Sequence, residues 1–443
     1  MKIAVVGGGM AGLGAAWSLA RRHAVTLFEA ESRLGGHANT VDVRIGGRDV
    51  AVDTGFIVYN EANYPLLTRL FAELGVATEA SVMSFSVSID AGRFEYAGNA
   101  AGLLAQPGNL LRRDHWRMLA DILRFNREAP ALLQAPAIPG EPTLGEFLRR
   151  RGYSTVFAER YLLPMAAAIW SSTLDEIANY PVRSLVQFFA NHGLLRLVGR
   201  PVWRTVRGGS RAYVERLTRA IAGEVRPGRP IVAVERGAGG VELRDAAGER
   251  AVFDQVVFAS HADQTLRLLG GGASDAERRI LRAFRYQGNR AVLHSDARTM
   301  PRRRRAWASW NYMAAGNTPA TRHLSVTYWM NRLQNLDTPS PLFVSLNPLV
   351  EPAADLTYRS FVYDHPQYDS AALAAQRELT ALQGQRGTWF CGSYCGYGFH
   401  EDALRSGLNV AAALGAPPPW PPAAPSGAAA GLGGAWPAPA AAE

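Results

Sequence analysis

Three glycines near the start of the chain have the spacing of a phosphate-binding turn. Gly7, Gly9 and Gly12 follow the apolar run 2–6 and open a helical pattern over 11–22. In a strand–turn–helix unit, the first glycine permits the tight turn and the second lets a diphosphate approach the backbone. The third lets the helix pack on the strand, and the positive end of the helix dipole then faces the phosphates. The pattern predicts a dinucleotide site.

An acidic residue follows the next strand. The apolar run 24–28 ends at Glu29, about twenty residues after Gly7. A carboxylate at this place accepts hydrogen bonds from the adenosine ribose hydroxyls. It also disfavours a 2′-phosphate, and hence NADP in this site.

A second glycine pair lies just beyond the acid. Arg33, Gly35 and Gly36 extend the motif, and the whole segment resembles that of the FAD-dependent amine oxidase and phytoene desaturase superfamily. In that family the second pair wraps the far side of the diphosphate. His37 stands where many members have arginine, and Glu31 stands where a basic residue is frequent. We therefore expect Arg33 and backbone amides to neutralise the phosphates.

Two later segments resemble further parts of the family's cofactor site. The resemblance places residues 53–60 beside the flavin, with Gly55 giving the ring room. Residues 230–260 read as a strand, a hairpin and a buried strand, in which Val234 would contact the adenine and Ala259 the ADP moiety. An ordinary β-meander fits residues 230–260 equally well.

The last cofactor segment lies near residue 400. A buried strand over 388–390 leads to Gly392 and Ser393, and a helix starts at 399–402. In the family, amides at this helix start face the flavin pyrimidine and stabilise negative charge on the reduced ring. Tyr394 stands where an acid is common and Asp402 where glycine is usual, so Ser393 is expected to take over a hydrogen bond to the ribityl chain or phosphate.

These segments define the predicted site residues. The expected FAD contacts are Gly7, Gly9, Met10, Ala11, Gly12, Glu29, Ala30, Arg33, Gly35, Gly36, His37, Thr54, Gly55, Phe56, Ile57, Val234, Ala259, Gly392, Ser393, Phe399, His400 and Glu401. By location, the candidates for proton transfer are Tyr397, His400, Glu401 and Tyr328.

The elements that position these residues predict an α/β fold. A discontinuous Rossmann-like FAD domain is expected over 1–61, 205–285 and 380–415. A substrate domain of mixed sheet and helices, as in amine oxidases, would take 62–204 and 286–379, with 62–199 mostly helical and 291–362 forming a sheet rich in aromatic residues. Residues 416–443 are rich in proline and alanine and are expected to form a flexible tail, with Trp420 and Trp436 as local anchors.

Composition favours a large enzyme of the cytoplasm. The chain has 443 residues, of which 48% are hydrophobic. Its first strand starts at residue 2, leaving no room for a signal peptide, and its apolar runs are shorter than the roughly 20 residues that span a membrane. Cys391 and Cys395 indicate neither a disulfide framework nor a metal set.

The chain is basic, with a net charge of +9 and a pI near 9.8. Arginines 302–305 form the densest cluster, which is typical of a solvated loop. In segment 110–125, the residues Leu111, His115, Met118, Leu119 and Ile122 recur at helical spacing among arginines. Such a helix packs on its own domain or rests on an anionic membrane surface. We expect no nucleic acid partner, and a location that is cytoplasmic or peripheral on the inner face of the membrane.

A narrower resemblance suggests the substrate. The strings 293–296, 307–312, 327–331 and 396–402 are similar to a bacterial subgroup of FAD-binding oxidoreductases. This subgroup is associated with methyltransferases that resemble cyclopropane fatty-acyl-phospholipid synthase, including those of furan fatty acid synthesis. The resemblance implies a methylated, unsaturated acyl chain on a phospholipid as substrate, and a methyltransferase as partner.

Three classes of function remain open: an acyl-chain oxidoreductase, an amine oxidase and a non-catalytic flavoprotein. A desaturase would pass a hydride from an activated carbon to the flavin, whereas an isomerase would return the hydrogen within the double-bond system. A flavin amine oxidase would instead hold a neutral amine in an aromatic cage. A non-catalytic FAD-containing partner of a lipid methyltransferase is the third reading.

Overall fold

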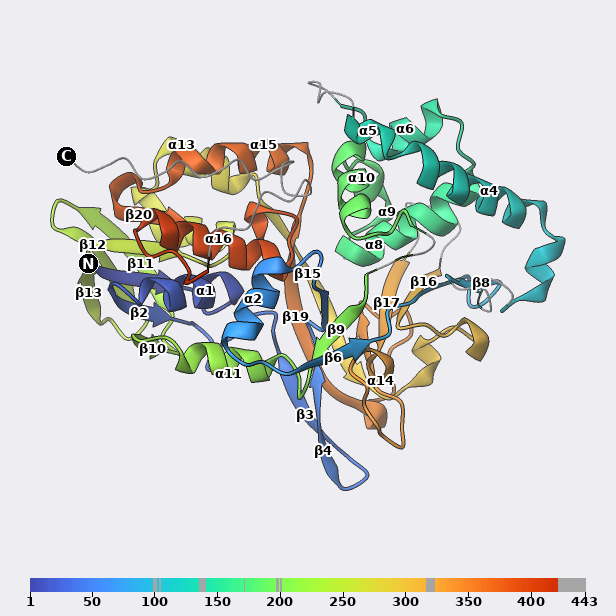
Figure 1. Ribbon diagram of the computed structural model, residues 1–443, viewed down its shortest axis with the longest axis horizontal. Coiled ribbons are helices and arrows are strands. Elements are labelled where there is room, and N and C mark those ends of the chain that lie inside the picture. The colour runs from blue at the N-terminus through green and yellow to red at the C-terminus, as the bar shows by residue number, and fades with distance from the viewer. Residues whose placement is uncertain are drawn as a thin grey trace.

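Two large sheets and a group of helices form the main body of the molecule. A parallel sheet with its helices lies at one end, and the helices from α4 (Arg113–Glu128) to α10 (Val182–Asn191) lie at the other (Figure 1). The long strands β15 (Arg285–His294) and β19 (Thr357–Gln367) run between them. This arrangement confirms the predicted α/β fold. The computed structural model describes residues 1–98, 102, 105–134, 141–170, 172–196, 199, 201–315 and 323–420.

Five short parallel strands form the sheet that carries the glycine motif. In spatial order they are β10 (Glu224–Arg226), β2 (Ala24–Phe28), β1 (Lys2–Val6), β14 (Gln255–Phe258) and β20 (Thr388–Phe390). All of β1 except its first residue is buried, as expected for a strand covered on both faces. Because the strands are parallel, the residues that follow β1, β2, β14 and β20 meet at one edge of the sheet.

Helices α1 (Met10–Leu19) and α16 (His400–Ala413) pack closely against each other. An added Cβ on Gly407 would lie 2.2 Å from the Ala11 carbonyl oxygen, and one on Gly14 would lie 2.6 Å from Leu404 Cδ1. Glycine on both helices therefore permits the close approach. Every residue of α1 is buried, and all of them except Ser18 are apolar or glycine, as expected for a helix that is covered on all sides. The packing fixes the start of α16 beside the glycine turn.

The predicted strand, hairpin and buried strand over 230–260 are confirmed. The first strands form an antiparallel meander, and β14 then joins the parallel sheet. The elements that complete this part of the molecule are β11 (Ile231–Gly237), β12 (Gly240–Asp245), β13 (Arg250–Phe253), α11 (Arg211–Arg219), α12 (Ala262–Leu269), α13 (Asp275–Arg282) and α15 (Ser370–Glu378).

A seven-stranded sheet forms the floor of the second part. Its order is β19, β15, β18 (Phe343–Leu346), β17 (His323–Trp329), β16 (Trp310–Ala315), β7 (Phe85–Ile89) and β8 (Phe94–Ala97). The last two strands come from a segment that we expected to be mostly helical. β7 pairs in parallel with β16, and its alternating sequence Phe-Ser-Val-Ser-Ile is the strand signal that the sequence analysis overlooked.

Eight helices lie between residues 65 and 191 of the described chain. All of them except α2 share one core with Val87 and Tyr312 of the large sheet, whereas α2 packs into the core around α1 and α16. Within the described residues, no helix is both long enough and apolar enough to cross a membrane. The eight helices are α2 (Pro65–Glu73), α4, α5 (Ala131–Gln134), α6 (Leu144–Arg150), α7 (Thr155–Phe157), α8 (Leu163–Trp170), α9 (Leu174–Ala178) and α10.

Short strands and turns connect the two parts. The strands form a hairpin of β3 with β4 and a small sheet in the order β5, β9, β6. Their bounds are β3 (Thr40–Ile45), β4 (Arg48–Asp53), β5 (Val58–Asn60), β6 (Thr78–Ser81) and β9 (Trp203–Val206). The short helical turns are η1 (Pro107–Leu111), η2 (Ala158–Leu162), η3 (Gly270–Gly272), η4 (Ala297–Thr299), η5 (Arg304–Ala306), α14 (Met330–Leu333), η7 (Ala354–Leu356), η8 (Leu379–Leu382), η9 (Gln385–Gly387) and η10 (Ser393–Cys395).

The start of the predicted tail is anchored. Ser18 Oγ donates to the Ala416 carbonyl at 2.7 Å, and the Trp420 ring stacks on Trp17 with ring centroids 5.4 Å apart. Trp420 thus has the local anchoring role that its sequence suggested. Trp436, the second expected anchor, lies outside the described residues.

Candidate active site

A large cavity runs from the glycine turn to the aromatic side chains of the helical group. Its volume is about 1350 Å³, above the roughly 300–1,000 Å³ of ordinary small-molecule pockets, so it has room for a dinucleotide and a second molecule. One end, here named the cofactor half, is lined by 7–11, 29–31, Arg33, 35–37, 54–57, 259–261, Gly392 and Ser393. The other end, named the aromatic half, is lined by Tyr161, Met165, Ile169, Trp170, Phe188, His192, Leu194, Trp310, Tyr328, Tyr397 and Phe399.

The two glycine motifs form one continuous cradle. Gly7 has a φ of +113°, and an added Cβ on Gly12 would lie 1.8 Å from the Gly7 carbonyl oxygen. The second motif lies directly on the first, because Gly35 N donates to the Gly8 carbonyl at 2.8 Å. An added Cβ on Gly36, where φ is +57°, would lie 3.2 Å from Gly9 Cα. The cradle thus exposes backbone amides to the cavity at the start of α1.

The Glu29 carboxylate is held at the rim of this cradle. It accepts hydrogen bonds from Gly8 N at 2.6 Å and from Glu31 N at 2.8 Å. Its position after β2 is the one that the sequence predicted for a ribose acceptor. Backbone donors therefore fix the orientation of this carboxylate.

The arginines of the cofactor half are already paired with acids. Arg33 contacts Glu31 at 2.9 Å and donates to the Gly36 carbonyl at 2.7 Å. Two further arginines, which were not predicted from the sequence, line the cavity at the cofactor half. Arg229 pairs with Asp245 at 3.3 Å, and Arg267 pairs with Asp263 at 2.8 Å. The acids reduce the positive charge that these arginines can offer to a diphosphate.

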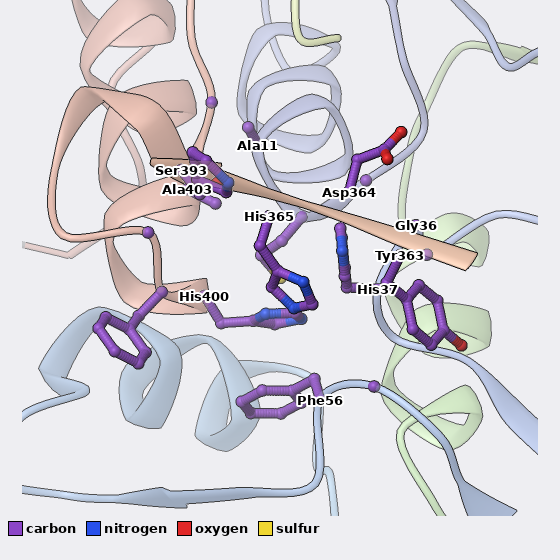
Figure 2. Close-up of a pocket in the computed structure, with 18 of the residues that line it drawn as sticks. Ala11, Gly36, His37, Phe56, Tyr363, Asp364, His365, Ser393, His400 and Ala403 are labelled. Atoms are coloured by element: carbon purple, nitrogen blue, oxygen red, sulfur yellow. The ribbon is translucent and has the colours of Figure 1, made fainter. Parts of the chain in front are cut away.

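Three histidines from separate elements meet beside the cradle. His37 follows the second glycine motif, His261 precedes α12 and His365 lies in β19; the His37 ring centroid is 6.3 Å from that of His261 and 5.4 Å from that of His365. Figure 2 shows the rings of His37 and His365 turned toward one another. His37 Nε2 is buried and has no hydrogen-bond partner in the described part of the chain. His261 and His365 were not predicted.

Burial keeps these imidazoles neutral. It lowers the pKa of His365 to about 4, and it lowers the pKa values of His261 and, most strongly, His37. The neighbouring His365 and His261 add to the effect on the pKa of His37. The structure thus places neutral, polarisable donors and acceptors where many relatives have an arginine.

His400 is fixed at the junction of the two halves. Its ring stacks on Phe56 with centroids 3.9 Å apart, and its Nε2 lies 2.9 Å from the Tyr213 hydroxyl (Figure 2). Burial lowers the pKa of His400 to about 3, so the ring is neutral near pH 7. The predicted helix start at this residue is confirmed, since α16 begins here.

Gly55 has a different role from the one expected. An added Cβ would lie 2.1 Å from the His37 carbonyl oxygen, and Phe56 N donates to that oxygen at 2.8 Å. The missing side chain therefore makes room for protein backbone, which corrects the expectation that it makes room for the flavin ring. Thr54 Oγ1 bonds to the Asn39 carbonyl at 3.0 Å and lies 2.7 Å from the Tyr363 hydroxyl, which braces the same loop.

Asp402 has a structural reason for replacing the usual glycine. Its carboxylate accepts hydrogen bonds from the backbone N–H groups of Tyr397 and Phe399, both at 3.1 Å. It thereby holds the turn that presents both rings to the aromatic half. Ser393 faces the cavity, as predicted, while the Tyr394 ring packs 4.9 Å from Phe284.

The aromatic half is uncharged. Phe188 stacks on His192 at 3.8 Å and on Phe399 at 5.1 Å between ring centroids, and Trp310 meets Tyr328 at 5.1 Å. Of the described residues that line the cavity, the acids and arginines all lie at the cofactor half: Glu29, Glu31, Arg33, Arg229, Arg267 and Asp364. This half therefore suits an apolar molecule.

The candidates for proton transfer separate in space. Tyr397 and Tyr328 line the aromatic half, and burial raises the pKa of both phenols. His192 also lines it and was not predicted; its Nδ1 lies 2.9 Å from the Phe188 carbonyl, so Nδ1 carries the proton and Nε2 is open. Burial lowers the pKa of His192 to about 4. No local motif marks this residue, which only the packing of α10 brings to the cavity.

Three predicted residues do not line the cavity. Gly12 supports the turn from behind, as its expected packing role requires. Val234 is buried in the core behind the meander, and Ile231, three residues earlier, faces the cavity instead. The Glu401 carboxylate accepts from Leu66 N at 2.9 Å and Leu67 N at 3.0 Å, so it caps α2. The expected cofactor contacts of Val234 and Glu401, and the candidacy of Glu401 as a base, are therefore corrected.

The cofactor half fits FAD. The cradle leaves no room for a Cβ at Gly12, its backbone amides open to the cavity, and the Glu29 carboxylate is held at its rim. The buried, unpartnered Nε2 of His37 is a polar atom that a bound ligand would satisfy. Further predicted contacts that line the same half are Met10, Ala11, Ala30, Phe56, Ile57, Ala259 and Gly392.

Comparison with protein families identifies the group to which this geometry belongs. The sequence model of the flavin containing amine oxidoreductases matches residues 10–291, which is well over half of the chain. The carotenoid phi-ring synthase of Chlorobaculum tepidum is 31% identical over 134 residues, or 30% of this chain. The match spans only 20% of that relative's length.

Solved structures share the fold over nearly the whole chain. The CLA-producing fatty acid isomerase from P. acnes has a TM-score of 0.65 and 15% identity, covering 91% of this chain and 96% of that one. Cyclohexylamine oxidase from Brevibacterium oxydans has a TM-score of 0.66 and 14% identity, covering 93% and 98%. At such identities the likeness concerns the fold.

Proposed function

The chain belongs to the flavin-containing amine oxidoreductase family, with FAD as its cofactor, and we propose that it acts as an oxidoreductase on a fatty acyl chain. The proposed substrate is a methylated, unsaturated acyl chain of a membrane phospholipid, and the reaction is desaturation or double-bond isomerisation. The observation that carries the proposal is the uncharged aromatic half, which adjoins the cofactor half in one cavity.

The lining of the cavity matches an acyl chain. Such a chain is apolar along its length and gains free energy from burial against aromatic and aliphatic side chains, at about 25 cal/mol per Å². Met165, Ile169 and Leu194 offer such surface beside the rings of Trp170 and Phe188. A protonated amine, by contrast, would meet no carboxylate among the described residues of this half.

Two comparisons support this choice of substrate class. One structure with the same fold is a fatty acid isomerase, and the relative matched by sequence is a carotenoid phi-ring synthase. Fatty acids and carotenoids are both long hydrocarbons with double bonds. The resemblance to oxidoreductases associated with lipid methyltransferases leads us to propose a methyltransferase as the partner that supplies the modified chain.

The residues of the chain bind the substrate, exclude water and handle protons. When bound, FAD supplies reversible acceptance of a hydride from carbon. The rings of Phe188, Phe399 and Tyr397 cover the junction between the halves and keep water from the reacting carbon. His192, neutral with its proton on Nδ1, is placed to take a proton at Nε2.

The decisive experiment follows the fatty acids. The purified flavoprotein is incubated without oxygen with phospholipids that carry a methylated, unsaturated chain, and the released fatty acids are analysed by mass spectrometry. A gain of one double bond identifies a desaturase, and a moved double bond with unchanged hydrogen content identifies an isomerase. Phospholipids with unmethylated chains are the control. Unchanged methylated chains at stoichiometric flavin would contradict the proposal.

The two other readings make different demands on the same sample. Amine oxidation would reduce the flavin when neutral alkyl or aryl amines are added without oxygen. A non-catalytic flavoprotein would keep an unchanged flavin spectrum with both amines and lipids. Reduction or a spectral shift that only lipids produce supports the acyl-chain oxidoreductase.

A further inference from the structure

We propose that the end of the helical group farthest from the parallel sheet docks on an anionic phospholipid bilayer. The surface, here named the distal patch, consists of exposed residues from the turn before β8, from η1 and α4, and from η5 with the residues just before it: Arg93, Leu110, Leu111, Arg112, Arg113, Trp116, Arg117, Arg302, Arg304 and Arg305. The choice of a lipid surface rests on the proposed function, but the existence of the patch does not.

Most of the apolar stripe that the sequence suggested for membrane contact is not available. Helix α4 buries His115, Met118 and Ile122, together with Phe125, against the core of the helical group. Leu119 is also packed against this core. The helix therefore packs on its own domain through the stripe predicted from its spacing, and any surface contact must use other residues.

The remaining stripe residue, Leu111, and two apolar side chains outside the stripe face solvent. Leu111 is 91% exposed, Trp116 is 55% exposed and Leu110 is 37% exposed. Trp116 Nε1 donates to the Leu110 carbonyl at 2.8 Å, which holds the indole beside η1 with more than half of its surface in water. Tryptophan and leucine projecting among arginines are typical of side chains that enter the headgroup region of a bilayer.

Glu95 of β8 joins this face to the four consecutive arginines. Its buried carboxylate accepts from Arg302 N at 2.7 Å and from Arg303 N at 3.1 Å, while Asn109 of η1 donates to its carbonyl at 3.1 Å. Arg303 is not available to an external anion, because its guanidinium pairs with Glu95 at 2.9 Å. The two basic segments singled out in the sequence, 110–125 and 302–305, thus flank one strand. Figure 1 shows β8 and α4 at the same end of the molecule.

The arginines of the distal patch are free to bind an anion. In the described part of the chain, the side chains of Arg93, Arg112, Arg113, Arg117, Arg302 and Arg305 form no ion pair. Arg304 lies 4.1 Å above the Trp307 ring, a contact that leaves its charge uncompensated. The exposed acid on the same stretch is Asp114. Many arginines elsewhere are paired, so this end concentrates positive charge.

A bilayer satisfies both components of the patch. The arginines are attracted to an anionic leaflet, and the leucines and tryptophan gain by leaving water. A nucleic acid would neutralise the arginines and leave Leu111 and Trp116 in water. Docking would also hold α8, whose Met165 and Ile169 line the aromatic half, close to the source of acyl chains.

The test measures vesicle binding by the complete flavoprotein without any turnover. Vesicles of unmethylated phosphatidylcholine, with or without phosphatidylglycerol, are sedimented with the protein at low and high salt. We expect binding to the vesicles that contain phosphatidylglycerol, with salt releasing most of the protein. Arg113→Glu with Arg117→Glu should weaken this binding by about tenfold or more.

Matched variants separate the patch from general basicity. Arg48→Glu with Arg359→Glu reverses two exposed arginines on β4 and β19, has the same net charge as the patch variant Arg113→Glu with Arg117→Glu, and should leave binding nearly unchanged. Leu111→Ser changes no charge and should weaken binding at high salt more than at low salt. Flavin content and the unfolding temperature confirm that each variant folds.

Three outcomes would overturn the inference. They are equal losses in patch and control variants, no preference for phosphatidylglycerol, and binding of a nucleic acid duplex in place of vesicles. Because these vesicles carry no methylated chain, the two proposals fail separately. A protein that docks through the patch and transforms no acyl chain contradicts the proposed function alone.

Discussion

The two halves of the cavity are built by different means. The cofactor half is made of backbone: a few glycines in two short motifs set the positions of its amides, and an acid at the end of a strand completes it. The aromatic half is made of side chains from η2, α8, α10, β16, β17 and the turn before α16. Backbone geometry leaves a mark in local sequence, whereas an assembled wall of rings does not. The glycine motifs and the acid of the first half were therefore predictable from local sequence, whereas most of the wall of the second half was not.

The cradle is the least tolerant part of the molecule. Gly12→Ala places a Cβ 1.8 Å from the Gly7 carbonyl oxygen, where only backbone movement can relieve the clash. We expect loss of bound FAD and a marked loss of folded protein. The flavin-to-protein absorbance ratio and thermal unfolding measure both effects.

Gly9→Ala is the matched control for this prediction. A Cβ on Gly9 meets nothing within 4 Å, although the residue lines the cavity. The unfolding temperature of the FAD-free protein should stay within about 2 °C, while FAD retention falls. Full flavin content in the Gly9 variant would show that the diphosphate does not lie on this turn.

A change in the aromatic half should leave the cofactor untouched. His192→Gln removes the open Nε2 and keeps a side chain that can bond to the Phe188 carbonyl. Turnover of the acyl substrate should fall by roughly 10²–10⁴, the range of a lost general base, at unchanged flavin content.

A second histidine variant controls for the substitution itself. His23→Gln alters a residue whose Nε2 contacts the Leu414 carbonyl, far in sequence from the aromatic half. It should retain full turnover. Comparable turnover in the His192 and His23 variants would rule out proton transfer by His192.

The folded FAD-free protein should begin to lose stability at a mildly acidic pH, already below about pH 6.5. Each buried histidine has a lower pKa folded than unfolded, so the unfolded chain binds more protons below pH 6.5 and stability falls from there toward pH 4, by up to about 1.4 kcal/mol per pH unit and group. The histidines concerned are His37, His115, His192, His261, His294, His365 and His400.

Three buried carboxyls oppose this trend without cancelling it. Burial raises the pKa of Glu401 to about 7 and of Asp53 to about 6, and it also raises the pKa of Asp402. These groups hold protons in the folded state, so they favour folding as the pH falls. Denaturant unfolding of the protein and of His365→Gln at several pH values measures the balance. A slope that His365→Gln leaves unchanged would contradict the buried, neutral state of His365.

The acids of the cofactor half give the smallest effects, and these have opposite signs. Glu29→Gln removes a charged acceptor and should weaken FAD binding by about tenfold. Glu31→Gln releases Arg33 from its 2.9 Å pair and should strengthen FAD binding by a few-fold. Titration of the FAD-free protein with FAD, followed by fluorescence quenching, gives both constants. A change of the same sign in both variants would argue against the separate roles assigned to the two acids.

The features that the sequence did not predict are contacts that only the tertiary fold creates. Gly55 was correctly singled out, but its neighbour is the His37 carbonyl, which no local pattern reveals. His261 and His365 reach the cradle from α12 and β19, so only the tertiary fold brings them to His37. On α4 the spacing correctly predicted the buried residues of the stripe, but it also included Leu111, which is exposed, and it gave no sign of the exposed Trp116.

The contact of α1 with α16 has a consequence for the order of folding. Helix α1 emerges from the ribosome early, yet its groove at Ala11 and Gly14 is filled by Leu404 and Gly407, almost 400 residues later. Until those residues are synthesised, this groove of α1 is uncovered and exposes a largely apolar surface. The pair of helices behind the nucleotide cradle is therefore completed only after α16 has been synthesised.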